Sequence, residues 1–171
     1  DNPFLKKFYD ENQANSFSTQ LYFLLKRIEQ SEKINRTDNM LVSDFYFGKD
    51  ELFARLNLSE LEFQMYNSIK NKLNFIPPIP DLIIYLQASS DILMERVRKR
   101  GLEIEKHIKK EYIESVNDIY MKHFHEYTSS PVLIINTSNV NINDENDYQL
   151  LIEEISSDIN GKKYFNPSSI K

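Results

Sequence analysis

A continuous apolar run, Leu82-Ile83-Ile84-Tyr85-Leu86, constrains the fold more than any other part of the sequence. An unbroken apolar run without polar alternation is typical of a parallel β-strand that is buried on both faces. Two similar runs, Met40–Val42 and Val132–Ile135, predict two further buried strands. Because helical patterns separate the three runs, the sequence predicts an α/β domain with a parallel sheet flanked by helices.

Apolar residues at helical spacing predict helices around these strands. The predicted helices cover about residues 3–11, 16–31, 49–56, 59–73, 90–100, 109–127 and 147–159. Ser59 and Glu62 fit a capping box at the start of the fourth helix, with Leu58 as a hydrophobic staple. Ser89 or Ser90 is expected to cap the fifth helix, and Gly101 to end it in a left-handed conformation. We expect the fourth helix to carry an apolar stripe of Leu61, Met65, Ile69 and Leu73.

Composition restricts the classes of function. The 171 residues suit one domain over about 1–160, with a loosely ordered tail over 161–171. A formal net charge of -5 argues against a nucleic-acid-binding surface. The absence of cysteine excludes disulfides and thiolate metal sites, and no apolar run approaches the roughly 20 residues that span a membrane. A cytoplasmic protein is the default expectation.

Three arginines, Arg96, Arg98 and Arg100, end the helix that follows the central apolar strand. Cations in the last turn of a helix complement its dipole, and that structural role alone could account for them. However, Arg96 and Arg100 are four residues apart and share a helix face, directly before Gly101. The same segment could therefore close over phosphate groups as a lid.

Two further positions suggest binding. Gln20 and Arg27 are seven residues apart and project within about 20° of each other, so they could read the edge of a planar heterocycle or simply flank the apolar stripe. Asp44 follows the run at Met40–Val42. An aspartate at the end of a buried parallel strand could hold magnesium, and it could equally cap the next helix.

Four separated segments together resemble the deoxynucleoside kinase family, particularly its bacterial deoxyguanosine and deoxyadenosine kinases. They occur in the family's order, from Asp1 to about Ile159, and are listed here as they stand: DNPFLKKFYDENQANSFSTQLYFLLKRIEQ, SDFYFGKDELFARLNL, PDLIIYLQASSDILMERVRKRGLEIE and PVLIINTS. The resemblance implies a homodimeric enzyme that transfers the γ-phosphate of ATP to the 5′-hydroxyl of a deoxynucleoside, with Mg²⁺ as cofactor. A purine deoxynucleoside is the favoured substrate.

The resemblance also implies roles for individual residues on the nucleoside side. Tyr9 and Glu105 look like the pair that binds the sugar 3′-hydroxyl. Gln20 and Arg27 look like the readers of the base. The remaining implied members of the nucleoside pocket are Leu5, Phe8, Thr19 and Phe53.

On the phosphate side, the resemblance implies that Asp44 is a catalytic residue and magnesium ligand. Arg96 and Arg100 match catalytic lid arginines, and Arg98 could bind phosphate with them. Asn141 and Ile142 fall near the loop that touches the adenine of ATP.

Three positions depart from the family pattern. Many members carry an acidic-Arg-Ser motif, whereas Phe45 follows Asp44 here, so the arginine has no counterpart. Leu102 stands where relatives often have another lid arginine, for which Arg98 could compensate. The aspartate that helps to read the base falls at or near Lys49 and Asp50, which leaves the choice between purine and pyrimidine open.

The glycines are few. With only Gly48, Gly101 and Gly161, the sequence has no G-x-x-x-x-G-K-[ST] phosphate loop. In the family that loop, the first strand and the general-base carboxylate precede the equivalent of Asp1. We therefore expect upstream residues or a partner segment to complete a five-stranded P-loop kinase sheet, and expect this chain alone to lack kinase activity.

Two other functions stay open. A catalytically inactive member of the same fold could act as a structural or nucleotide-binding subunit. A nucleoside monophosphate kinase such as thymidylate kinase shares the strand order and the lid, although Gln20 and Arg27 lie in the block that reads a nucleoside.

Overall fold

The computed structural model describes residues 2–10, 15–33, 40–138, 140–141 and 143–167. Its elements follow in the order α1 (Leu5–Asp10), α2 (Ser16–Glu32), α3 (Gly48–Asn57), α4 (Glu60–Lys72), β1 (Ile83–Gln87), α5 (Ser90–Arg100), the 3₁₀ helix η1 (Glu103–Glu105), α6 (Lys110–Glu126), β2 (Val132–Asn136), α7 (Glu145–Ser156) and β3 (Lys162–Phe165). The predicted α/β class with a parallel sheet flanked by helices is confirmed. The described strands form one parallel sheet in the order β1-β2-β3.

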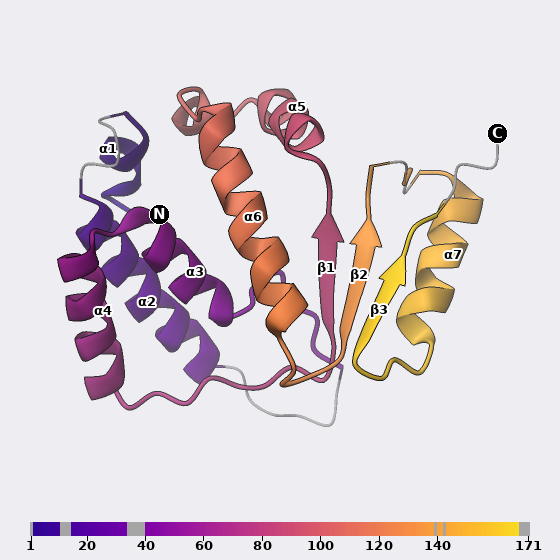
Figure 1. The fold of residues 1–171 in the computed structure, drawn as a ribbon, viewed down its shortest axis with the longest axis horizontal. Helices are drawn as coiled ribbons and strands as arrows, with labels where there is room; N and C mark the ends of the chain where they lie inside the picture. The colour runs from indigo at the N-terminus through magenta and orange to yellow at the C-terminus, as the bar shows by residue number, and fades with distance from the viewer. Residues whose placement is uncertain (1, 11–14, 34–39, 139, 142, 168–171) are drawn as a thin grey trace.

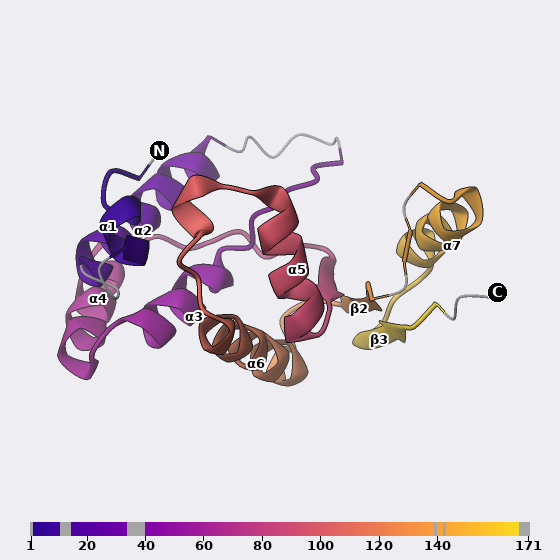
Figure 2. The ribbon, with the colours of Figure 1, turned by 90° about the horizontal axis from the view of Figure 1, so that it is seen from above.

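The helices form two unequal groups around this sheet. In Figure 1, α1 to α4 gather on the left, α6 stands between them and the sheet, and α7 lies beyond β3. Figure 2 shows α6 and α7 on opposite sides of β2 and β3. Phe124 of α6 packs with Ile83, Tyr85 and Ile134 on one face of the sheet, whereas α7 covers the other face. A third cluster, centred on Leu24, joins α2, α3 and α4.

The local signals at the helix ends are confirmed. Ser59 accepts a hydrogen bond from the backbone N–H of Glu62, whose side chain accepts from the backbone N–H of Ser59, so the capping box is complete. Ser89 caps α5, and Gly101 ends it with φ of 66°, a left-handed conformation that glycine adopts without a Cβ clash.

The predicted strand at Met40–Val42 is wrong. These residues have no strand assignment, and Met40 and Val42 are 92% and 85% exposed. A short apolar run becomes a strand only when its backbone pairs with a neighbour, and no described strand pairs with this segment. Asp44 consequently lies in an exposed bend rather than at the end of a buried strand.

The third strand comes instead from the segment after Gly161, which was expected to be loosely ordered. Lys162–Phe165 pairs in parallel with β2, from Val132 opposite Lys162 to Ile135 opposite Phe165. The segment is only half-buried, so hydropathy gave little sign of it. Backbone pairing with an adjacent strand is what stabilises it.

Burial on both faces holds for β2 and fails for β1. Every residue from Val132 to Ile135 is buried, but Ile84 and Leu86 of β1 are 40% and 61% exposed. Strand β1 is at the edge of the described sheet, and neither of these two side chains belongs to the cluster that packs against α7. Edge position, rather than sequence, therefore decides the burial of these two side chains.

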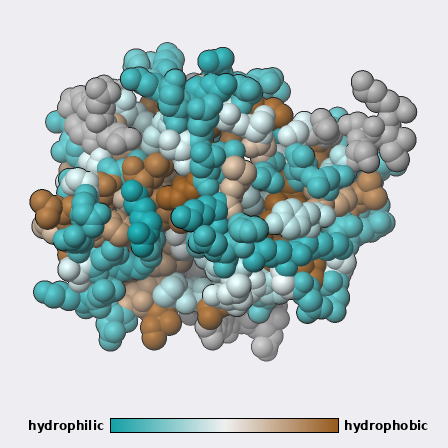
Figure 3. Space-filling view, viewed as in Figure 1, coloured by the Kyte–Doolittle hydropathy of each residue, from teal (hydrophilic) through white to brown (hydrophobic). Residues whose placement is uncertain are grey.

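Helix α4 is rotated relative to the predicted stripe. Tyr66 is fully buried and Phe63 packs beside it in the α2–α4 cluster, whereas Leu61 and Met65 are 74% and 55% exposed. Apolar side chains also reach the surface on the side that α2 and α4 form, at the left of Figure 3. Among the described residues, no helix is long and apolar enough to cross a membrane.

Candidate functional site

The inner face of α2 carries buried polar groups without partners. Thr19 and Gln20 are 1% and 3% exposed, and no described residue hydrogen-bonds the Thr19 hydroxyl or the Gln20 Oε1. A buried polar atom that lacks a hydrogen bond costs about 1–3 kcal/mol, so such atoms are rare unless a ligand completes them. This pair is the strongest structural indication of a binding site.

About two helical turns further along α2, Arg27 joins a buried ionic cluster. Its guanidinium donates to one carboxylate oxygen of Asp50, and the Tyr66 hydroxyl donates to the other. Asp50 is only 1% exposed and the Arg27 side chain 15%. Burial raises the pKa of Tyr66, so its hydroxyl stays protonated and remains a donor.

Aromatic rings hold the Arg27 guanidinium in position. The carbon at its centre lies 5.0 Å from the ring centres of both Phe23 and Phe45. Phe45, which follows Asp44 in the sequence, thus contacts the predicted base reader. Only the small exposed part of the Arg27 side chain can contact a ligand.

A second set of predicted residues meets where α1 contacts η1. Arg100 donates two hydrogen bonds to Glu105, from Nε at 3.0 Å and from Nη2 at 2.7 Å. Burial raises the pKa of Tyr9, and the nearby Glu105 carboxylate raises it further while Arg100 lowers it. The structure therefore brings Tyr9, Glu105 and Arg100 together, with Arg100 held by a carboxylate.

The predicted pocket walls are aromatic and packed. Phe8 is buried, with its ring centre 5.0 Å from that of Tyr9 and 6.5 Å from that of Tyr112. Leu5 and Phe53 are half-buried, and the Phe53 ring lies 6.1 Å from Tyr120 of α6. Helices α1, α3 and α6 therefore all contribute aromatic surface near the polar groups of α2.

Arg96 lies at the carboxyl ends of the parallel strands. It donates to the Thr137 hydroxyl at 2.9 Å and to the Thr137 carbonyl at 2.8 Å, directly after β2. The Thr137 hydroxyl in turn donates to the carbonyl of Gln87, the last residue of β1. Ligands of open parallel sheets bind at this edge, so Arg96 is well placed for an anion.

The other predicted residues are less constrained. Arg98 is exposed on α5, and Asp44 is exposed in its bend. The backbone N–H of Asn141 donates to Asp147, and its side chain accepts from the backbone of Asn143, which orders the start of the loop. Ile142 lies outside the described residues.

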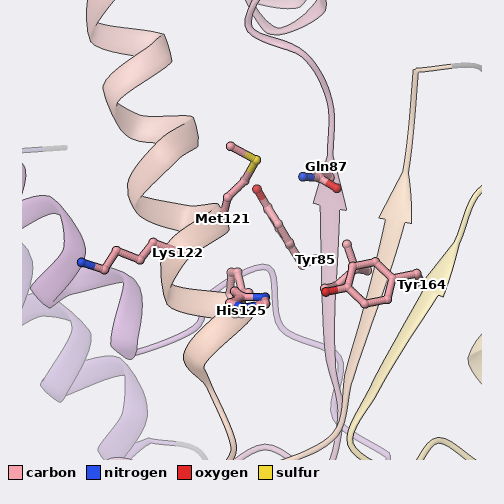
Figure 4. Close-up of a pocket in the computed structure, with 8 residues that line it drawn as sticks. Tyr85, Gln87, Met121, Lys122, His125 and Tyr164 are labelled. Carbon is pink, nitrogen blue, oxygen red and sulfur yellow. The ribbon is translucent and has the colours of Figure 1, made fainter.

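One cavity of about 350 Å³ opens elsewhere, on the α6 side of the sheet. Figure 4 shows Tyr85 and Gln87 of β1, Met121 and His125 of α6, and Tyr164 of β3 around it, with Lys122 pointing away from the strands. None of the predicted site residues lines this cavity. It is separate from the polar groups of α2.

The sequence profile of the deoxynucleoside kinase family matches residues 1–160. The chain belongs to the deoxynucleoside kinase family. Its relatives include the deoxyguanosine kinase of Bacillus subtilis, 34% identical over 124 residues, which make up 70% of this chain and 60% of that protein. The deoxyadenosine/deoxycytidine kinase of the same organism is 28% identical over 165 residues, covering 91% of this chain and 76% of that protein.

Solved structures support the same fold. Deoxyadenosine kinase from M. mycoides, with the products dCMP and dCDP bound, superposes with a TM-score of 0.79 at 21% identity, over 92% of this chain and 82% of that one. The same kinase with bound dATP gives a TM-score of 0.76. The P-loop kinase fold predicted for this deoxynucleoside kinase is thereby confirmed.

Tyr66 was missed by the sequence reasoning. The apolar spacing of Leu61, Met65 and Ile69 predicted a different face of α4 from the one that is buried. The useful signal was the pair Phe63 and Tyr66, three residues apart, whose rings stack at 6.2 Å. A tyrosine on a buried helix face needs a partner for its hydroxyl, and Asp50 supplies it.

Proposed function

We propose that the full-length protein transfers the γ-phosphate of ATP to the 5′-hydroxyl of a deoxynucleoside, with a purine favoured. The observation that carries this proposal is the buried, unpartnered Gln20 amide oxygen beside the unpartnered Thr19 hydroxyl. A base that enters this site can donate to Gln20 while its ring lies against Phe8 or Phe53. Family membership supports the same reaction.

The sugar would bind between Tyr9 and Glu105. Burial keeps the Tyr9 hydroxyl protonated and able to donate, while the Glu105 carboxylate can accept from the 3′-hydroxyl. The bond from Arg100 fixes the orientation of Glu105 before the substrate arrives. Such positioning is the main requirement of phosphoryl transfer, because the reaction needs little covalent assistance.

The phosphates would meet Arg96 and Arg100, with Arg98 within the same last turns of α5. Arg96 is already oriented at the carboxyl ends of the strands through Thr137. Preorganised cations stabilise the charge that develops on the transferred group and need little reorganisation during reaction. Asn141 and Ile142 are proposed to contact the adenine of ATP.

Asp44 is the residue proposed to hold Mg²⁺. Among the described residues no group of three carboxylates or histidines could enclose a metal ion. Mg²⁺ at kinase sites is commonly bound by one or two carboxylates together with substrate phosphates, and an exposed Asp44 suits that arrangement. The ion would supply charge neutralisation at the phosphates.

The test is an assay of the full-length protein with radiolabelled ATP against the four deoxynucleosides and their monophosphates. Formation of labelled deoxynucleoside monophosphate supports the proposal. Phosphorylation of monophosphates alone would favour a nucleoside monophosphate kinase. Binding of deoxynucleosides without any turnover would favour a catalytically inactive member.

We also propose a homodimer formed through α4. Leu61, Met65 and Leu73 are 74%, 55% and 41% exposed, and Leu25 of the adjoining α2 is 53% exposed. Exposed apolar surface of this kind commonly marks a protein interface. Met65→Glu should shift the protein from dimer to monomer in light scattering, whereas Leu150→Glu on α7, also exposed, should leave the mass unchanged. A monomeric wild type would contradict the proposal.

A further inference from the structure

Lys49 is a cation in an unfavourable place. It is the second residue of α3, where the positive end of the helix dipole repels a cation. Its side chain is half-buried, and no described carboxylate lies within ion-pair distance of its ammonium group. Burial lowers the pKa of Lys49 and the Arg27 guanidinium lowers it further, whereas Asp44 opposes the shift. Lys49 and Arg27 therefore lie close enough to repel each other, and of the two only Arg27 is paired with a described carboxylate, that of Asp50.

The surroundings of Lys49 are those of the nucleoside pocket. Its ammonium lies 5.7 Å from the ring centre of Phe53, one helical turn along α3. Arg27, next to it, is flanked by Phe23 and Phe45. Aromatic walls suit a planar base rather than a phosphate, which would meet Arg96 at the strand ends.

The carboxylate of Asp50, the residue after Lys49, already accepts hydrogen bonds within the protein. Both carboxylate oxygens of Asp50 accept hydrogen bonds, from Arg27 and from Tyr66, and Asp50 is 1% exposed. Because Asp50 is almost fully buried and each of its oxygens already accepts a hydrogen bond, an incoming base has little access to it. What this side of the pocket offers is donors: the ammonium of Lys49 and the exposed part of Arg27.

We propose that Lys49 selects a 6-oxopurine by donating a hydrogen bond to its O6. This inference rests on the proposed function. Guanine presents acceptors at O6 and N7, the atoms that Lys and Arg bind best among the bases, whereas adenine presents an amino donor in place of O6. The Gln20 oxygen, which has no described partner, can accept from N1–H of the same base. In deoxyadenosine the 6-amino group would face the Lys49 ammonium, and two donors that meet without an acceptor disfavour binding.

The experiment compares kcat/KM of the full-length protein for deoxyguanosine, deoxyinosine and deoxyadenosine. Deoxyinosine keeps the 6-oxo group and lacks the 2-amino group, so it isolates the contact to O6. Wild type should favour both 6-oxopurines over deoxyadenosine by about tenfold or more. Lys49→Met should reduce that preference about tenfold, mainly through KM, and Lys49→Arg should restore most of it. Lys72→Met, at an exposed lysine of α4, is the matched control.

Two results would overturn the inference. One is a wild-type preference for deoxyadenosine. The other is an equal loss for all three nucleosides in Lys49→Met, which would indicate a phosphate contact or a folding defect. Calorimetric titration with the same nucleosides, without ATP, measures the preference independently of turnover. Absence of phosphorylation together with selective binding of deoxyguanosine would therefore refute the proposed reaction and still support the role of Lys49.

Discussion

Asp50→Asn removes the negative charge of the buried cluster while preserving the size of the side chain. Asp50 is 1% exposed and the Arg27 side chain 15%, so the substitution leaves a buried guanidinium without its counter-charge. Breaking a buried pair by removing one partner costs about 3–5 kcal/mol, because the remaining charge stays desolvated. For a chain of 150–250 residues, each kcal/mol lowers the Tm by about 2–4 °C, so we expect a fall of about 6–20 °C.

Thermal and urea unfolding followed by circular dichroism measure this loss. Tyr66→Phe removes only the hydroxyl that donates to Asp50 and should cost about 1.5–3 kcal/mol, the usual range for a hydrogen bond to a charged group. Glu29→Gln breaks exposed pairs with Lys26 and Lys33 and should leave the Tm almost unchanged. A loss below about 1 kcal/mol for Asp50→Asn would refute the view that the cluster is desolvated.

Three further predictions concern catalysis, binding and pH. Arg100→Ala should lower turnover by about tenfold or more in the full-length protein, and Arg98→Ala should lower it less. Steady-state kinetics measure both, and an unchanged kcat for Arg100→Ala would show that this arginine has a purely structural role. Gln20→Ala should raise the KM for the nucleoside and blur base preference, whereas a loss of thermal stability alone would mark Gln20 as structural. Burial beside Tyr46 and Phe124 lowers the pKa of His123, so the unfolded chain binds a proton at higher pH than the folded one. Stability should therefore be complete above about pH 6.5 and fall as the pH drops below it, and urea titrations of His123→Asn should show a weaker dependence.

Local signals in the sequence were sufficient for most elements. The capping box at Ser59, the left-handed Gly101 and the apolar run at Val132–Ile135 all formed as expected, because each depends on atoms a few residues apart. The strand at Met40–Val42 did not form, and Lys162–Phe165 did. Strands depend on a partner backbone, which a single run of residues does not specify.

The candidate site was also predictable from the sequence only in part. The sequence indicated Gln20 and Arg27 by their seven-residue spacing, and the structure places Gln20 in a buried position and Arg27 in a half-buried one. The position of Arg100 in the last turn of α5 was also readable, but its bond to Glu105 was not, since it depends on how η1 turns back toward α5.

The sequence by itself determined the α/β class, the order of the helices and the motifs of the deoxynucleoside kinase family, because periodicity and local capping follow from neighbouring residues. Only the tertiary structure decided that Asp50 is closed off by Arg27 and Tyr66 while Lys49, one residue earlier, lacks a described carboxylate partner. Adjacent residues on a helix point about 100° apart, so which one is buried depends on the packing of α2 and α4 against α3. That packing also leaves donors rather than acceptors facing the proposed base.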